Sequence, residues 1–106
     1  MKITTHDTGG SAIITLHGDF ISDTDQLAFR DRVKALAAKG QSHLIIDLKH
    51  VKYMNSCGLG SLICALTTVR KAGGDLQLAS VGPDVSEILR ITQLDTIFEI
   101  HTSVTE

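Results

Sequence analysis

Leu44-Ile45-Ile46-Asp47-Leu48 is a short and nearly unbroken apolar run, and the stretch Asn55-Ser56-Cys57-Gly58-Leu59-Gly60 follows it closely. Such a run predicts a central β-strand that is covered on both faces. Apolar side chains then recur at helical spacing until the glycines at 73 and 74, which predict the end of the helix. These helical positions are Leu59, Leu62, Ile63, Leu66 and Val69. The pattern is a strand that leads directly into a helix.

The residues before this stretch predict a β-hairpin and a first helix. Gly9-Gly10 supplies the positive φ of a tight turn, and a two-residue turn would place Ile3 opposite Leu16 and Thr5 opposite Ile14. Either Ser22 or Asp23 can cap the helix that follows, and Gly40 would end it. Its expected apolar stripe comprises Phe29, Val33, Leu36 and Ala37.

The residues after the central helix predict a further strand and a third helix. Leu76-Gln77-Leu78 alternates as a strand does, and Pro83 suits the first turn of a helix. The buried face of that helix is expected at Val85, Ile88, Leu89 and Thr92. The apolar residues Ile97, Phe98 and Ile100 predict a last strand or a short helix. Residues 102–106 are expected to form a loose tail. Strands that alternate with helices predict a single α/β domain over residues 1–106, with a mixed, mainly parallel β-sheet, packed α-helices and an N-terminal β-hairpin.

The composition of the chain argues against nucleic-acid binding, membrane insertion and a disulfide. The 106 residues carry a formal net charge of −2 and only 4% aromatic side chains, so direct nucleic-acid binding is not expected. The longest uncharged run, residues 53–69, contains polar residues and is short for a membrane span, and the first residues lack the apolar core of a signal peptide. Cys57 and Cys64 lie seven residues apart, two turns along a helix and out of reach of a disulfide. We expect a soluble, cytoplasmic protein with reduced thiols.

Enzyme signatures are weak in this chain. Gly58-Leu59-Gly60 lacks the third glycine of a dinucleotide fingerprint, and there is no phosphate-binding GK[ST] loop. The histidines do not have zinc-ligand spacing, Ser56 lacks a GxSxG context, and a Cys57 nucleophile would need a histidine that sequence alone does not place. We therefore expect no catalytic residue, no metal, no cofactor and no small-molecule substrate.

The central helix has an unusual second face. Beside its apolar stripe, the positions Cys57, Gly60, Ser61, Cys64 and Thr68 are small and uncharged, whereas a solvated face normally carries charge. Either another segment of this chain covers that face, or a second protein does. The second interpretation is favoured because so short a chain has few layers with which to bury both faces. The amino end of the helix suits either a bound anion or a capping side chain such as that of Asn55.

Residues 43–48 followed by 51–60 resemble the signature of the STAS domain, and of the bacterial anti-sigma factor antagonists in particular. The family pattern is an apolar strand ending in Asp-Leu, a short turn, and then Asp-Ser-Ser/Thr-Gly-Leu-Gly opening a helix; the likeness extends over nearly the whole chain, as a single STAS domain over 1–106. The resemblance implies a regulator that binds an anti-sigma factor of the serine kinase type and so releases the sigma factor by partner switching. In the family, phosphorylation of the second residue of the Ser-Ser/Thr pair prevents binding to the anti-sigma factor.

This chain departs from the family pattern at two positions. Asn55 stands where the family has Asp, and Cys57 stands at the phosphoacceptor position. Three accounts of Cys57 are open: a small structural residue that leaves the protein permanently able to bind, a neighbour of a substitute phosphoacceptor at Ser56, or an oxidisable switch. The expected partner-binding residues are Asn55, Ser56, Cys57, Gly58, Leu59, Gly60, Ser61, Cys64 and Thr68. Alternative functions are a STAS scaffold subunit of a lipid transporter or stress-signalling complex, and a thiol catalyst at Cys57.

Overall fold

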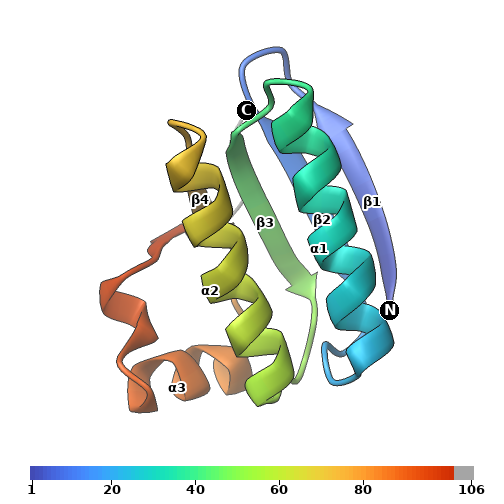
Figure 1. The fold of residues 1–106 in the computed structure, drawn as a ribbon. Coiled ribbons are helices and arrows are strands. Elements are labelled where there is room, and N and C mark those ends of the chain that lie inside the picture. The colour runs from blue at the N-terminus through green and yellow to red at the C-terminus, as the bar shows by residue number, and fades with distance from the viewer. Residues whose placement is uncertain (102–106) are drawn as a thin grey trace.

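Five strands form one mixed sheet in the computed structural model, which describes residues 1–101 (Figure 1). The strands lie side by side in chain order, so β3 is central; only β1 and β2 are antiparallel, and the other pairs are parallel. Their bounds are β1 Lys2–Asp7, β2 Ala12–His17, β3 His43–His50, β4 Asp75–Ala79 and β5 Glu99–His101. The predicted α/β class, the hairpin and the central strand are confirmed.

The register of the β1–β2 hairpin is the one that the turn predicts. Ile3 pairs with Leu16 and Thr5 with Ile14. The turn itself is closed by the Thr8 amide, which donates to the Ser11 carbonyl at 2.9 Å. Gly9 has a φ of +92°, which an L side chain rarely adopts, so glycine is needed there.

Helices α1 (Asp23–Ala38) and α2 (Ser56–Lys71) run side by side over one face of the sheet (Figure 1). Ser22 is the N-cap of α1, because its hydroxyl accepts from the Asp25 amide. Gly40 and Gly73 follow α1 and α2 with φ of +85° and +84°, as predicted for residues that end a helix. Helix α3 (Pro83–Ile91), which begins with the predicted proline, lies across the N-terminal end of α2 (Figure 1), and the 3-10 turn η1 (Leu94–Thr96) leads into β5.

The core fills the space between the sheet and these helices. Alternate residues of the inner strands point into it, and the apolar stripes of the helices close it. The main contributors are Ile14, Leu16, Leu44, Ile46, Leu48, Leu76, Leu78, Phe29, Val33, Leu62, Leu66, Val69, Val85 and Leu89, all at most 3% exposed. On the opposite face of β3, Asp47 is buried and Ile45 is half-buried, so this second face is covered less completely than the first.

A few predicted core positions lie elsewhere. Thr92 is exposed and is the C-cap of α3, so its assignment to the buried face was wrong. Ile63 and Ala37 are only half-buried at the margins of their stripes. Phe98 is buried, whereas Ile97 and Ile100 are exposed. The tail predicted at 102–106 lies outside the described residues.

Candidate functional site

Helix α2 begins where two loops meet at one edge of the sheet. The loops follow β2 and β3, which are parallel neighbours, so both loops leave from the same edge. The Phe20 amide donates to the Tyr53 carbonyl at 3.2 Å, and the Asn55 amide donates to the Phe20 carbonyl at 3.3 Å. The Asp19 carboxylate accepts from the amides of Lys52 (3.3 Å) and Tyr53 (3.1 Å). These bonds fix the position from which α2 starts.

Asn55 caps α2 with its side chain. Its Oδ1 accepts from the amides of Cys57 (3.0 Å) and Gly58 (3.2 Å), and its own carbonyl accepts from the Leu59 amide at 3.0 Å. The Nδ2 group donates to the Ile21 carbonyl at 3.0 Å and so ties the helix start to the neighbouring loop. Three amides at the start of α2 therefore already have acceptors within the chain, as the capping interpretation of the sequence predicts.

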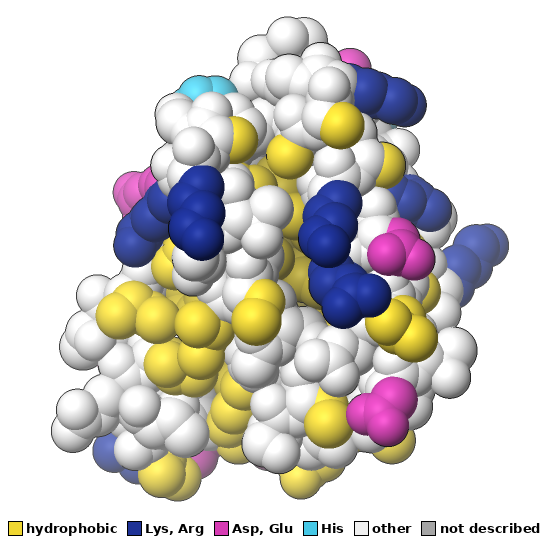
Figure 2. All heavy atoms as spheres, viewed as in Figure 1, with side chains coloured by type: hydrophobic (Ala, Val, Ile, Leu, Met, Phe, Trp, Pro, Cys, Tyr) yellow, Lys and Arg dark blue, Asp and Glu magenta, His cyan; other side chains and the backbone are white. Residues whose placement is uncertain are grey.

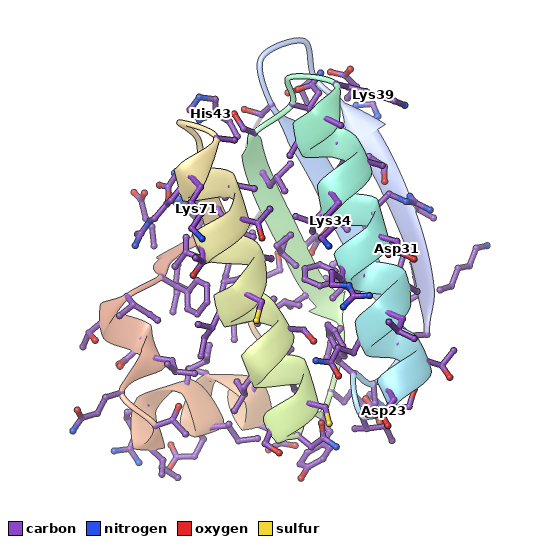
Figure 3. All side chains as sticks on the ribbon, viewed as in Figure 1. Asp23, Asp31, Lys34, Lys39, His43 and Lys71 are labelled. Carbon is purple, nitrogen blue, oxygen red and sulfur yellow. The ribbon has the colours of Figure 1, made fainter. Side chains whose placement is uncertain are left out.

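Cys57, the residue at the phosphoacceptor position of the family pattern, is half-buried between the starts of α1 and α2. Its Sγ donates to Oδ1 of Asp23 at 3.8 Å, and its carbonyl accepts from the Ser61 hydroxyl at 2.8 Å. Figure 3 shows Asp23 at the lower end of α1, beside the start of α2. Ser56 is exposed, so the thiol and the neighbouring hydroxyl occupy different environments.

The structure separates the nine expected partner-binding residues into an outer and an inner group. Ser56 and Cys64 are exposed, and Asn55, Cys57, Gly60 and Thr68 are partly exposed, whereas Gly58, Leu59 and Ser61 are buried by the chain itself. A Cβ on Gly58 would lie 2.4 Å from Met54 Cγ and 2.7 Å from the Phe20 carbonyl oxygen, so glycine is required by close approach. The uncharged face of α2 is thus covered by the chain at its inner residues and open at its outer ones.

Two large apolar side chains border the start of α2 and were not predicted as site residues. Ile21 and Tyr53 are each 49% exposed, and both belong to the loops that hold Asn55. The sequence carries a signal that could have identified them, because the loops after two neighbouring parallel strands must meet at one edge of the sheet. Exposed apolar side chains beside an uncharged helix face are typical of a protein-binding surface.

The thiol of Cys57 and the histidines of the sheet lie in separate surroundings. The Cys57 thiol donates to the Asp23 carboxylate, and the histidine pair His17 and His50 stacks with ring centroids 4.9 Å apart on the sheet. Within residues 1–101, no group of three or more His, Cys, Asp or Glu side chains is placed to hold a metal ion. Both cysteines are free thiols. None of the helices in the same range combines the length and apolarity that crossing a membrane requires.

Comparisons with known proteins agree with the resemblance seen in the sequence. A family model described as the STAS domain matches residues 2–106. The chain is 25% identical to the anti-sigma F factor antagonist of Paenibacillus polymyxa over 92 residues, which is 87% of this chain and 79% of the relative. It is 37% identical to the anti-sigma-B factor antagonist of Bacillus subtilis over 71 residues, which is 67% of this chain and 64% of the relative.

A solved structure shares the fold. The crystal structure of an anti-sigma factor antagonist from Mycobacterium paratuberculosis superposes with a TM-score of 0.84 at 22% sequence identity, and the match covers 97% of this chain and 86% of the other. At this identity the likeness shows the arrangement of strands and helices alone. The match of the family model over nearly the whole chain is the broader finding.

Proposed function

This chain belongs to the STAS domain family, and from that premise we propose that it acts in the cytoplasm as an anti-sigma factor antagonist. It binds an anti-sigma factor of the serine kinase type, releases the sigma factor and so regulates transcription by partner switching, without catalysing a reaction itself. The names of the two relatives and the resemblance in residues 43–60 support this proposal.

The observation that carries the proposal is the uncharged, partly open surface at the start of α2. We define the docking surface as Ser56, Cys57, Gly60, Cys64 and Thr68 together with Ile21 and Tyr53. No charged side chain belongs to this set, and both large apolar residues are half exposed. Burial of such a surface against a partner removes apolar area from water at little desolvation cost. The buried residues Gly58, Leu59 and Ser61 position this surface from beneath.

Cys57 removes the hydroxyl that phosphorylation would need at this position. A phosphate adds roughly −1.5 to −2 charges at pH 7, and at this position it would lie beside the Asp23 carboxylate and inside a close-packed interface. A serine kinase does not modify a thiol, so this off-signal is absent at Cys57. Ser56 is the exposed hydroxyl next to it and is the position at which a substitute modification is to be sought.

Capture from the native cell tests the proposed partner. The tagged chain is used as bait, the recovered proteins are identified by mass spectrometry, and the intact mass of the bait reports its modification. We expect a stoichiometric complex with a kinase-type anti-sigma factor and a bait that is unmodified at Cys57. Recovery of a transporter ATPase or of a stress-signalling assembly in its place would contradict the proposal and favour a scaffold role.

Variants at Cys57 test the docking surface. Cys57→Asp places a charge in the interface and should weaken the complex by about tenfold or more, whereas Cys57→Ser should bind like the wild type and become a substrate of the kinase. Ala35→Asp, at an exposed position of α1, is the matched control for added charge and should bind normally. Affinities are measured by calorimetry on variants whose urea unfolding shows an intact fold. Unchanged affinity of Cys57→Asp would remove this residue from the interface.

A further inference from the structure

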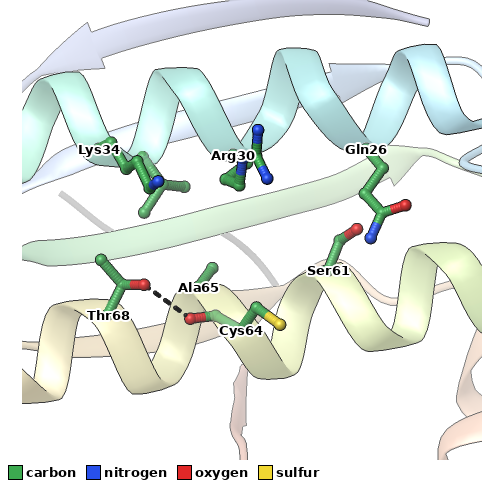
Figure 4. Close-up of a pocket in the computed structure, with 8 residues that line it drawn as sticks. Gln26, Arg30, Lys34, Ser61, Cys64, Ala65 and Thr68 are labelled. Atoms are coloured by element: carbon green, nitrogen blue, oxygen red, sulfur yellow. Dashed lines mark hydrogen bonds between the residues drawn. The ribbon is translucent and has the colours of Figure 1, made fainter.

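A hollow of about 130 Å³ lies between α1 and α2, beside the docking surface (Figure 4). Its lining includes the buried apolar side chains of Val33 and Ala65, and the side chains of Gln26 and Ser61 point toward each other across it (Figure 4). The full lining is Gln26, Arg30, Val33, Lys34, Ser61, Cys64, Ala65 and Thr68. The lining residues of α1 lie between positions 26 and 34, which are about 12 Å apart along the helix axis. We call this hollow the α1–α2 groove.

The charge of the groove is opposite to that of the molecule. Arg30 and Lys34 line it, and no acidic residue of the described part of the chain does, although the chain has a formal net charge of −2. Figure 2 shows Lys and Arg side chains beside a hollow that exposes hydrophobic atoms, and Figure 3 shows Lys34 on α1. Both basic residues that line the hollow come from α1. Among residues 1–101, neither Arg30 nor Lys34 has an acidic partner within 4.0 Å.

We propose that the α1–α2 groove receives an acidic, amphipathic segment of the partner protein. One apolar side chain of the segment enters the hollow over Val33 and Ala65, and its carboxylates pair with Arg30 and Lys34. The Gln26 amide is placed to donate a further hydrogen bond to the segment. A carboxylate is expected to pair with these two cations because they line the groove and have no acidic partner among residues 1–101.

The size and place of the groove favour a protein segment over a small molecule. Binding sites for drug-sized ligands usually have volumes of roughly 300–1,000 Å³, and this hollow is well below that range. It is also continuous with the docking surface, since Cys64 and Thr68 belong to both. A helix or extended segment that crosses the docking surface can therefore place one side chain in the groove. The inference rests on the proposed function and specifies the chemistry of the partner.

A titration with a synthetic peptide tests the groove without an anti-sigma factor, so its outcome is independent of the capture experiment. The probe is a short N-acetylated amphipathic peptide with leucines on one face and glutamates beside them; its twin has lysine in place of every glutamate. Amide shifts of the ¹⁵N-labelled full chain are followed by NMR. We expect saturable shifts confined to residues 26–34 and 61–68 with the acidic peptide, and none with the lysine twin.

Charge-reversal variants complete the test. Arg30→Glu combined with Lys34→Glu should weaken binding of the acidic peptide by about tenfold or more. Lys2→Glu combined with Lys49→Glu changes the net charge equally at two exposed positions of the sheet and should leave binding unchanged. Loss of fold is checked by the dispersion of the same spectra.

Four outcomes would overturn the inference. The first two are the absence of shifts at the groove residues and equal binding by the lysine twin. The third is equal saturation by hexanoate, a small carboxylate with an apolar tail that is titrated in the same way. The fourth is a set of shifts at the same residues that depends on the concentration of the free chain. Equal saturation by hexanoate would indicate a small-carboxylate site, and the concentration-dependent shifts would indicate that a second copy occupies the groove.

Discussion

Asn55 serves two elements at once, and an aspartate could serve only one of them. Its Oδ1 caps α2 at the amides of Cys57 and Gly58, while its Nδ2 donates to the Ile21 carbonyl. A carboxylate retains the cap but has no hydrogen to donate. The departure from the family pattern at this position therefore adds a bond between α2 and the loop before α1.

Substitution of Asn55 should separate these two roles. Asn55→Ala removes the cap and the loop bond and should lower the free energy of unfolding by about 1–2 kcal/mol. Asn55→Asp keeps the cap and adds a favourable charge at the helix start, so it should lie within about 1 kcal/mol of the wild type. Urea unfolding gives both values, and hydrogen exchange at residues 56–59 checks the cap directly. Equal losses in the two variants would show that the bond to Ile21 is the one that matters.

At the scale of the element, the two glycines of α2 have opposite surroundings. A Cβ at position 58 would meet Met54 Cγ at 2.4 Å and the Phe20 carbonyl at 2.7 Å, whereas a Cβ at position 60 would have nothing within 4 Å. Gly58→Ala should therefore destabilise the fold by about 1–3 kcal/mol. Gly60→Ala should stabilise it by up to about 1 kcal/mol, since alanine favours a helix over glycine.

Urea unfolding of the two alanine variants, measured side by side, checks this difference in sign. Because both substitutions add one methyl group to the same helix, helix propensity alone predicts equal gains. Equal gains in the experiment would mean that α2 does not approach Phe20 as closely as the structure shows.

The elements themselves could be predicted from the sequence, because each is encoded by its own local pattern. The register of the hairpin follows from Gly9-Gly10, and the ends of α1 and α2 follow from Gly40 and Gly73. Thr92 was assigned to the core by its helical spacing, but its hydroxyl instead donates to the Ile88 carbonyl at the end of α3. In a helix as short as α3, helical spacing alone does not show whether the last position belongs to the buried face or to the C-cap.

The candidate site was predictable only where it lies within one segment. The role of Asn55 as the cap of α2 could be predicted, because this residue directly precedes an apolar helix. Its bond to Ile21 and the bond from Cys57 to Asp23 each join residues 34 positions apart, and the groove joins side chains of two helices. Such contacts depend on how α1 and α2 pack on the sheet. The pairing of parallel strands predicts which loops meet, but not which side chains touch.

At the scale of the whole molecule, an ion pair connects the first residue of the chain to α1. The Met1 ammonium lies 3.2 Å from Oδ1 of Asp25, and both side chains are almost fully buried. Met1 directly precedes the edge strand β1, whose residues are otherwise mostly exposed. The pair therefore holds the edge of the sheet against the start of α1, close to the cap at Ser22.

The pH dependence of stability should report this ion pair. Burial raises the pKa of the Asp25 carboxyl, but the hydrogen bond with Ser22 and the Met1 ammonium lower it by more, so its pKa lies below the ordinary value of 3.8. The ionised carboxylate thus stabilises the fold above that value, and the contribution is lost as the pH falls through the lower, folded pKa. Asp25→Asn should lower the free energy of unfolding at pH 7 by roughly 1 kcal/mol, and this difference should shrink below pH 3.8. Urea unfolding at a series of pH values measures it.

Acetylation of Met1 provides the matched control for the Asp25 prediction. It removes the ammonium charge and leaves Ser22 in place. The free energy of unfolding of the acetylated chain should therefore depend on pH less than that of the wild type, but more than that of Asp25→Asn. A difference between the wild type and Asp25→Asn that stays constant down to the lowest pH would mean that the ionisation of Asp25 does not contribute to stability. In that case β1 would be held to α1 by its hairpin and by the hydrogen bond from Arg32 to Thr5, and the ion pair would add nothing measurable.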